Sequence, residues 1–399
     1  MLKPNVGGRG SRWPLIVALA LSAAVALVGA VVALMGRHPS PTASPTPSGV
    51  PQPPGPSPRS TFFDLTPAPT ARPVPLASSV SQTADVVYLK THSLDQGTLE
   101  AVDWSGHVAG SVTVDRRLRV NPSPNGRWLL LDDSVFRSDG AFVLTLPFSG
   151  LGSVWASDSS HLCTLTSGPT VAVASVPDGQ TRSVKTGDLN TVDPPALLAC
   201  NISDDRLLMR TRHIDPAGPG LAIDLVSVAL STGAVTQRLS VCAAPHACAP
   251  VQLAAAPDAR TAVSGGGTED VSRIDTVRGT RSRIGSAATP VAVSGDGRRV
   301  VVQLDDALSS SGSGPGGVAL IDLSGGATLW QQAGVVTADY FVLARAGRPE
   351  VMVGISPRGA LGNGGIFPPG PVTLLLLDTR GSAVVVRSSV ADVAGTLRG

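Results

Sequence analysis

The stretch that decides the fold is residues 123–146, SPNGRWLLLDDSVFRSDGAFVLTL. It combines two local patterns. In the first, a turn of Ser, Pro, Asn, Gly and Arg (123–127) leads into the apolar run Trp128–Leu131. In the second, two apolar segments flank a turn that contains Gly140. The second pattern predicts a β-hairpin, because glycine readily adopts the positive φ of a tight turn and large apolar residues favour the flanking strands.

Both patterns repeat along residues 81–399. The hairpin glycine recurs at a mean spacing of about 46 residues, and its seven copies are Gly106, Gly140, Gly179, Gly233, Gly279, Gly326 and Gly381. The Ser/Asp/Gly turn precedes six of these hairpins, at residues 123–127, 157–160, 203–206, 257–260, 294–298 and, in degenerate form, 345–348. Two patterns that alternate in register indicate one structural unit repeated along the chain.

Composition argues against a mainly helical protein. The 399 residues include 44 Gly and 34 Pro, which break helices. Lys and Glu, which usually coat exposed helices, are rare, with three of each: Lys3, Lys90, Lys185, Glu100, Glu269 and Glu350. The surface must therefore consist largely of Asp, Arg, Ser and Thr, which suits turns and strand ends.

The repeated turn carries a resemblance. The copies S-P-N-G-R-W-L-L-L (123–131) and S-G-D-G-R-R-V-V-V (294–302) resemble the S-P-D-G-R-x-hydrophobic turn of TolB-like and WD40-like β-propeller repeats. No copy has the Gly-His and Trp-Asp pair of a strict WD40 repeat, so the chain is similar to the divergent, bacterial-type propellers. The resemblance, together with a period of one four-stranded blade, implies an all-β propeller over residues 81–399. We expect seven four-stranded blades, and six remain open because the first two intervals are short.

A propeller ring must be closed, because closure removes open sheet edges. The first repeat begins at about Ser81, with the strand Asp85–Leu89, and is one strand shorter than the others. We expect Ser389–Arg398 to supply the missing strand and so to pair the end of the chain with its beginning.

The N-terminal region predicts a membrane anchor. Pro14–Met35 has 22 residues without a charge, enough to cross a bilayer core as a helix. Lys3, Arg9 and Arg12 precede it, which by the positive-inside rule places the N-terminus in the cytoplasm. We expect a cytoplasmic tail (1–13), a transmembrane helix (14–36), a disordered Pro/Ser/Thr-rich linker (37–80) and the propeller (81–399). The protein would be a single-pass protein of the cell membrane with its propeller outside.

The four cysteines all fall in the part expected outside the membrane. An even number in an oxidising compartment suggests two disulfides. We expect Cys242 to pair with Cys248 across a tight loop, and Cys163 to pair with Cys200 between neighbouring blades. The other two connectivities stay open at this point. A metal site around His246 is disfavoured, because no further ligand stands at usual spacing.

Other motifs do not identify a reaction. Residues 312–317 satisfy G-x-G-x-x-G but lead into a strand rather than a helix, and no His pair has metal-binding spacing. The Asp pairs at 132–133, 204–205 and 305–306 fit turn capping better than calcium binding. Asn201-Ile-Ser203 is a formal glycosylation sequon. We therefore assign no catalytic, cofactor-binding or metal-ligating residue.

Charge argues against a nucleic-acid partner. The first 80 residues hold six of the 31 Lys and Arg but one of the 29 Asp and Glu, which leaves 25 basic against 28 acidic residues in the predicted propeller. Nucleic-acid binding depends on neutralising phosphates and needs the opposite balance.

These observations favour a membrane-anchored, extracytoplasmic propeller that binds or scaffolds proteins. The bilayer contact would be Pro14–Met35, and the partner contacts would lie in two long loops. Their candidate residues are Arg212, His213 and Asp215, and Ser311 and Ser313. Two alternatives stay open: a propeller hydrolase or lactonase with a metal at the central channel, and a ligand sensor that works with a separate membrane partner.

Overall fold

The structure is a computed structural model, and it describes residues 86–92, 97–103, 108–114, 120–137, 140–148, 152–166, 169–215, 220–243, 248, 251–267, 269–304, 316–344, 347–357 and 372–390. These residues all belong to one compact unit, Pro67–Gly399. They contain no helix that could span a bilayer. The expected tail, transmembrane helix and linker (1–80) lie outside the described residues.

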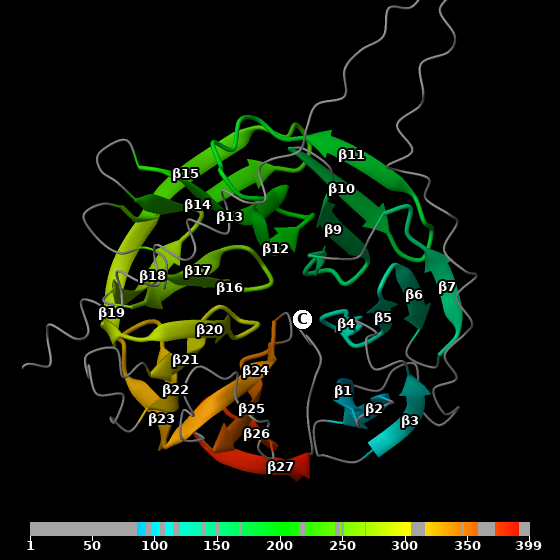
Figure 1. Cartoon of the computed structure of the whole chain (residues 1–399), viewed down its shortest axis with the longest axis vertical. Helices are drawn as coiled ribbons and strands as arrows, with labels where there is room; N and C mark the ends of the chain where they lie inside the picture. The colour runs from blue at the N-terminus through cyan, green and yellow to red at the C-terminus, as the bar shows by residue number, and fades with distance from the viewer. Residues whose placement is uncertain are drawn as a thin grey trace, which may run out of the picture. The chain divides into compact units, whose positions relative to one another are not determined.

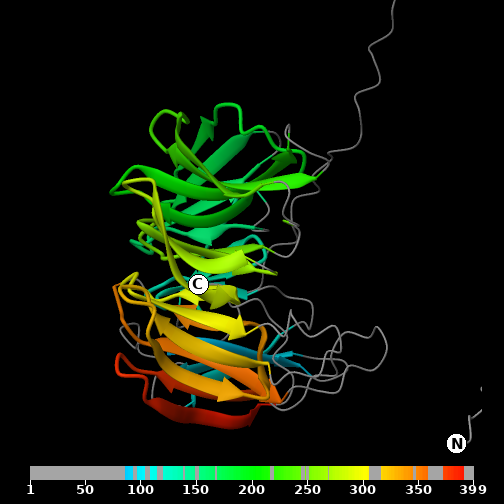
Figure 2. The ribbon, with the colours of Figure 1, turned by 90° about the vertical axis from the view of Figure 1, so that its left-hand side faces the viewer.

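The described residues form a β-propeller of antiparallel sheets set radially around an axis (Figure 1). The first sheet has three strands, β1 (Val86–His92), β2 (Gly97–Asp103) and β3 (Val108–Val114). The other six sheets, which we call blades two to seven, have four strands each. The described residues thus contain six four-stranded blades, the smaller of the two numbers that the sequence left open, beside the three-stranded first sheet. Seen from the side in Figure 2, the strands run between the two faces of the ring.

In blades two to seven the chain runs from the innermost strand to the outermost. Blade two contains β4 (Val120–Pro122), β5 (Trp128–Leu131), β6 (Ser134–Arg137) and β7 (Phe142–Thr145). Blade three contains β8 (Val154–Trp155), β9 (His161–Leu165), β10 (Thr170–Ser175) and β11 (Thr181–Lys185). Blade four contains β12 (Ala196–Asn201), β13 (Arg206–Ile214), β14 (Leu221–Ala229) and β15 (Val235–Cys242).

The remaining blades follow the same order. Blade five contains β16 (Gln252–Ala255), β17 (Thr261–Gly266), β18 (Glu269–Asp275) and β19 (Thr280–Ala287). Blade six contains β20 (Thr289–Val293), β21 (Arg299–Leu304), β22 (Gly317–Asp322) and β23 (Thr328–Ala333). Blade seven contains β24 (Val335–Ala344), β25 (Val351–Pro357), β26 (Val372–Leu377) and β27 (Ala383–Val390).

The expected closing strand, Ser389–Arg398, does not begin where the sequence suggested. Ser389 and Val390 are the last residues of β27, and Val390 pairs with Val372 in β26. The reason is that the outer strand of the last hairpin is eight residues long and extends into the segment assigned to closure. Residues 391–398 lie outside the described residues.

The hydrophobic cores lie between blades rather than within them. Side chains alternate across each strand, so a middle strand buries residues on both faces. In β21, Val300 and Val302 join a cluster with Val263 of blade five, whereas Val301 packs in a cluster with Val353 of blade seven. A single blade therefore cannot bury its apolar residues without both neighbours, which is why the repeat must continue around the ring.

The hairpin glycine joins successive blades. Gly233 has a φ of +75°, and a Cβ there would lie 1.9 Å from the carbonyl oxygen of Lys185, in the outer strand of the preceding blade. A Cβ at Gly326 would lie 2.1 Å from the Ile284 oxygen, and one at Gly381 would lie 2.0 Å from the Leu329 oxygen. Glycine is needed both for the left-handed turn and for the close approach between blades.

The Ser/Asp/Gly turn connects the first and second strands of each four-stranded blade. The next-to-last residue of the turn is left-handed in every copy, although glycine fills this position in only three of them. The six residues are Gly126, Gly297, Gly347, Ser159, Asp205 and Ala259, with φ values of 69°, 68°, 76°, 58°, 52° and 59°. A neighbouring side chain caps the turn, as where the Asn125 Oδ1 accepts from the Arg127 N–H at 2.9 Å. The repeat is therefore preserved in backbone geometry more strictly than in residue type.

Candidate functional site

Two of the predicted loop residues, Arg212 and His213, lie in a strand. The sequence suggested a loop over residues 210–220, but β13 continues to Ile214 and pairs with β14 without a register shift, from Arg206 opposite Ala229 to Ile214 opposite Leu221. The strand extends so far because the arginines that made the segment look irregular alternate with the buried residues Met209 and Thr211. Asp215 follows the strand and closes the hairpin, where its N–H donates to the Gly220 carbonyl at 3.0 Å. Ser311 and Ser313 lie outside the described residues.

Three exposed apolar side chains come together at the end of this hairpin. Ile214 and Leu221 face each other across its last pair and are 69% and 41% exposed. Val192, which is 50% exposed, comes from the segment before β12, and its N–H donates to the Arg212 carbonyl at 2.8 Å. We call Val192, Ile214 and Leu221 the hairpin-tip surface. Because strands alternate in direction, it lies at the face of the ring opposite the glycine turns.

A buried carboxylate braces the strands beneath this surface. Asp224 of β14 is almost fully buried and lies 3.1 Å from the Arg238 guanidinium of β15. The same guanidinium donates to the Leu189 carbonyl at 2.9 Å. Nδ1 of His213 lies 3.5 Å from the Asp224 carboxylate. Arg238 thus ties the segment that carries Val192 to the hairpin that carries Ile214.

A second ion pair lies at the edge of the surface. The Arg212 guanidinium lies 3.7 Å from the Asp193 carboxylate, and both groups are partly exposed. The Arg212 N–H also donates to the Thr191 hydroxyl at 3.4 Å. The hairpin-tip surface therefore has an apolar centre and a polar rim.

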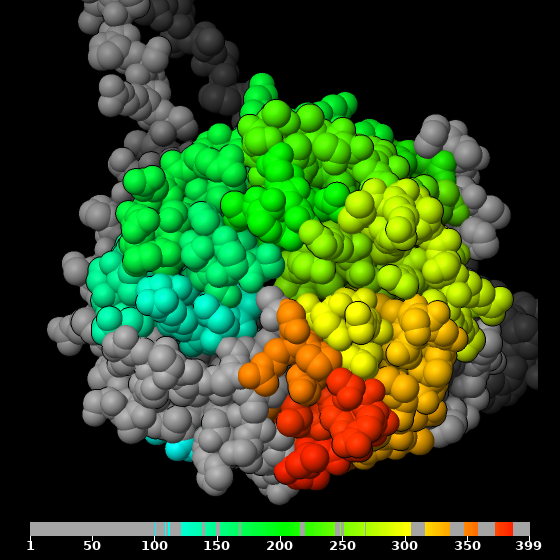
Figure 3. All heavy atoms as spheres, turned by 180° about the vertical axis from the view of Figure 1, so that it is seen from behind, coloured from blue at the N-terminus to red at the C-terminus, as the bar shows by residue number. Residues whose placement is uncertain are grey.

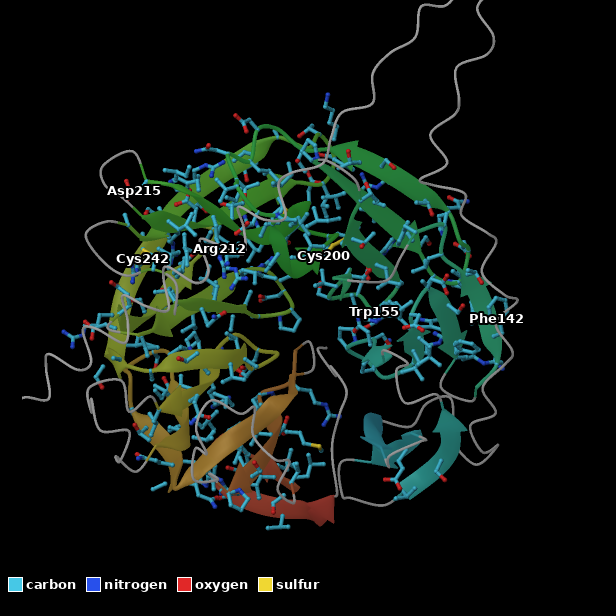
Figure 4. The ribbon with its side chains drawn as sticks, viewed as in Figure 1. Phe142, Trp155, Cys200, Arg212, Asp215 and Cys242 are labelled. Carbon is cyan, nitrogen blue, oxygen red and sulfur yellow. A yellow bond between two sulfur atoms is a disulfide. The ribbon has the colours of Figure 1, made fainter. Side chains whose placement is uncertain are left out.

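Both expected disulfides are present, with the expected pairing. Cys163 of β9 is bonded to Cys200 of β12, which joins blade three to blade four. Cys242 at the end of β15 is bonded to Cys248 in the connection to blade five. Figure 4 shows Arg212, Asp215 and Cys242 in one sector of the ring, with Cys200 in the same blade. The candidate surface thus lies on a covalently reinforced part of the propeller.

The Asp204–Asp205 pair links its turn to neighbouring segments. The Arg260 guanidinium of blade five donates to both carboxylate oxygens of Asp204 in blade four, at 2.6 and 2.9 Å, and this hydrogen bond lowers the pKa of Asp204. The Asp205 carboxylate accepts the Ser231 N–H at 2.6 Å. Asp305 and Asp306 lie outside the described residues. Within the part of the chain that the structure describes, no group of three or more His, Cys, Asp or Glu side chains is arranged to hold a metal ion.

The glycosylation sequon is buried in the joint between two blades. Asn201 is 4% exposed, and its amide nitrogen donates to the Asp258 carbonyl of blade five at 2.7 Å. Its Oδ1 accepts from the Ser203 hydroxyl at 2.8 Å. This side chain is a structural link and is not available for modification in the folded ring.

Sequence reasoning missed most of the groups that build the hairpin-tip surface. Asp224 had a signal, since it is the one charged residue in the apolar run Leu221–Leu230 and a buried charge needs a partner. No sequence signal points to Arg238 or Val192, because their contacts join segments 20 to 50 residues apart and no local motif encodes such contacts.

Comparison with known proteins adds fold likeness alone. No protein-family model matches the sequence, and a comparison with curated proteins finds no match. The WD40 repeats of RRP9 align with a TM-score of 0.44 and 12% identity over 76% of this chain and 86% of that chain. The β-propeller domain of Myceliophteria thermophila Cps50 (Swd1) aligns with a TM-score of 0.44 and 11% identity, over 70% and 92%.

A third similar structure is an oligogalacturonate lyase from Vibrio parahaemolyticus, with a TM-score of 0.47 and 9% identity over 75% of this chain and 84% of that chain. At such identities a likeness concerns architecture only. The β-propeller assignment itself rests on the strand order within each sheet and on the radial arrangement of the sheets.

Proposed function

We propose that this protein is a single-pass membrane protein that holds a TolB-like, bacterial-type propeller outside the cell, where the propeller binds a protein partner through the hairpin-tip surface and catalyses no reaction. The observation that carries the binding role is the exposure of three large apolar residues. Ile214 and Leu221 lie opposite each other on the hairpin, and Val192 lies on the segment whose backbone is hydrogen-bonded to Arg212 of that hairpin.

The chemistry of the surface suits a protein partner. Contiguous exposed apolar side chains with a polar rim are typical of protein-binding sites, in which a few central apolar side chains dominate the affinity. Arg212 and Asp193 supply such a rim. The Arg238 link and the Cys242–Cys248 bond hold the surface in place, which reduces the entropy that binding must overcome.

The proposed location has separate support. The uncharged run Pro14–Met35 and the basic residues before it are typical of a signal anchor with a cytoplasmic N-terminus. Two disulfides that use all four cysteines are typical of an oxidising compartment.

Photo-cross-linking of the full chain in its native membranes tests the binding role. A benzoylphenylalanine in place of Ile214 should give a discrete adduct larger than the chain. The same probe in place of Val277, which is 57% exposed on a turn of blade five, is the matched control and should not. Adding Leu221→Asp should reduce the adduct at 214 at least about tenfold, because a charge at the centre of an apolar contact is desolvated at high cost. Equal adducts from both positions, or an adduct that survives Leu221→Asp, would contradict the proposal.

Cysteine labelling of intact cells tests the location. Because no free cysteine exists among the four natural ones, each introduced thiol is the only reactive one. A membrane-impermeant maleimide should label Ser81→Cys and leave Ser11→Cys unlabelled. Labelling of Ser11→Cys, or protection of Ser81→Cys, would place the propeller on the other side.

A further inference from the structure

Three buried oxygen atoms at the joint between blades two and three lack a hydrogen-bond partner among the described residues. They are Oδ1 of Asn121 in β4, Oγ of Ser153 just before β8 and Oγ1 of Thr164 in β9. Thr164 is completely buried, and Ser153 is 8% exposed. Figure 3 shows the turquoise atoms of blade two against the green atoms of blade three. A buried polar atom without a partner costs free energy, so such atoms are normally satisfied by protein or by ordered water.

The pairing of β8 with β9 brings the two hydroxyl residues together. Trp155 pairs with Leu162, and two residues further along the antiparallel register places Ser153 opposite Thr164. Trp155 and Leu162 pack in a core cluster with Leu130 of blade two. Side chains two residues apart point to the same face of a strand, so Ser153 and Thr164 face blade two as well.

Asn121 reaches the same place from blade two. Its Nδ2 donates to the Ser153 carbonyl at 3.1 Å, and its own carbonyl accepts from the indole N–H of Trp155 at 3.0 Å. Because Oδ1 and Nδ2 are bonded to the same carbon, Oδ1 also lies close to Ser153. Turning the amide over would not satisfy Oδ1, since it would then meet the Ser153 carbonyl, which is another acceptor.

We propose that Asn121, Ser153 and Thr164 bind one ordered water molecule, which links blade two to blade three. The water donates to Oδ1 of Asn121, which can only accept, and the two hydroxyls can each donate or accept. Three protein partners is the usual number for a buried water. A cation suits the site less well, because the three atoms are neutral oxygens and do not balance a buried charge.

Blade five offers a matched position without such a site. Ser264 is the fourth residue of β17, as Thr164 is of β9, and its buried hydroxyl also lacks a partner among the described residues. The residue opposite Ser264 is Leu253, where blade three has Ser153. A leucine cannot share a water with the hydroxyl, so the water site belongs to the joint between blades two and three. The proposal does not depend on the hairpin-tip surface of blade four.

Urea titration of the full chain in detergent, followed by tryptophan fluorescence, tests the site. Thr164→Val removes the hydroxyl and keeps the shape of the side chain. It should raise the equilibrium constant for unfolding about tenfold, because the water and its other partners lose a hydrogen bond. Ser264→Ala is the control, and it should leave this constant unchanged or lower it, because it removes a hydroxyl that has no partner. A lower or unchanged constant for Thr164→Val, or an equal rise for Ser264→Ala, would overturn the proposal.

A double-mutant cycle shows whether the two hydroxyls share one water. Ser153→Ala should cost clearly less stability in the Thr164→Val background than in the unmodified protein, because the first change has already weakened the bound water. Additive losses would contradict a shared water. Replacing sodium chloride by choline chloride at equal ionic strength should leave the urea midpoint of the unmodified protein unchanged. A fall in that midpoint that Thr164→Val abolishes would assign the site to a sodium ion and overturn the proposal.

Discussion

Blades three to five and blades six and seven have the same repeat but are joined by different side chains. In blades three to five, arginines reach across the joints: Arg182 donates to the Leu230 carbonyl at 2.8 Å, and Arg281 donates to the Val241 carbonyl at 2.7 Å. Both disulfides also lie there. In blades six and seven, backbone groups make the corresponding link, where the Asp296 N–H donates to the Arg348 carbonyl at 3.0 Å. We call these the stapled sector (β8–β19) and the plain sector (β20–β27).

The difference shows that a repeat protein can reinforce some joints without changing its fold. The glycine turn serves both sectors, since Gly233 and Gly381 meet the preceding blade at almost the same distance. The disulfides and the shorter arginine links are found in the stapled sector, whereas in the plain sector Arg299 of blade six donates to the Pro349 carbonyl of blade seven at 3.5 Å.

The largest expected effect comes from the disulfide that joins blades three and four. Replacing Cys163 and Cys200 by Ala should lower the free energy of unfolding by about 4 kcal/mol, because the bond closes a long loop in the unfolded chain. Replacing Cys242 and Cys248 should cost only about 2 kcal/mol, because that loop is short. Urea titration of the two double variants measures the difference. Equal losses would mean that the disulfide between blades stabilises the protein no more than the disulfide that closes a local loop.

The glycine turn should matter equally in both sectors. Gly233→Ala and Gly381→Ala should each cost about 3 kcal/mol, because the new methyl group meets a backbone oxygen and the left-handed φ is unfavourable for Ala. Gly334→Ala is the control, since Gly334 has a φ of +72° with nothing within 4 Å of its Cβ, and should cost about 1 kcal/mol. Thermal unfolding of the three variants checks this. A large loss of stability for only one of Gly233→Ala and Gly381→Ala would show that the glycine turn does not have the same role in both sectors.

The short arginine links of the stapled sector should each contribute to stability. Arg182→Met should lower the free energy of unfolding by about 1 kcal/mol, since it removes a charged hydrogen bond to the Leu230 carbonyl while it keeps the apolar stem. Arg278→Met is the control, because Arg278 makes only an exposed ion pair with Asp275 and should change stability little. Chemical denaturation of both variants decides. If Arg278→Met costs as much, the links across the joint have no special role.

Acid should weaken the glycine hairpins of both sectors. The pKa of Asp275 is lowered chiefly by the Arg278 N–H, that of Asp322 by the Ser324 hydroxyl, and that of Asp378 by the Ser382 N–H. A carboxyl with a lowered folded pKa stabilises the protein above the ordinary value of 3.8, and this contribution is lost as the pH falls from there through the folded value. Replacing all three by Asn should flatten the fall in the urea midpoint between pH 5 and pH 3. If the urea midpoint of the triple variant fell with pH as steeply as that of the unmodified protein, other groups would be responsible for the acid sensitivity.

The smallest effect is a gain in the stapled sector. Ala259→Gly should raise the free energy of unfolding by about 0.5 kcal/mol, because glycine adopts a φ of +59° without the strain that Ala has there. The gain is small because glycine also increases the conformational entropy of the unfolded chain. Ala262→Gly, in the adjacent strand β17, is the control and should destabilise. Precise denaturant midpoints measure both. A loss on Ala259→Gly would show that the Ala methyl group makes a packing contact worth more than the strain.

Local turn chemistry made the fold predictable. The glycine hairpins and the capped turns each depend on a few adjacent residues, so the repeat and its antiparallel hairpins could be predicted from the sequence, and the resemblance of the repeated turn implied the propeller. The cysteine pairs followed from the same repeat, because it placed Cys163 and Cys200 in neighbouring blades. The ends of strands were less predictable, as β13 shows: Arg210 and Arg212 interrupt an apolar run that nevertheless continues to Ile214.

The candidate surface was only partly predictable for the same physical reason. Arg212, His213 and Asp215 were selected as loop residues, and they do lie beside the hairpin-tip surface. The apolar side chains at its centre could not be recognised, because the sequence pattern around an exposed Ile at the end of a strand does not differ from the pattern around a buried Ile. Exposure depends on which segments pack nearby, and that is a property of the closed ring.

The buried position of Asn201 has a practical consequence for production of the protein. A eukaryotic secretory host attaches sugars to Asn-Ile-Ser before the chain has folded. A glycan on this nitrogen would occupy the space where the Asp258 carbonyl must arrive. In molecules made in such a host, blade five would be unable to pack against blade four. Export through a bacterial pathway without this modification would leave the contact between the two blades free to form.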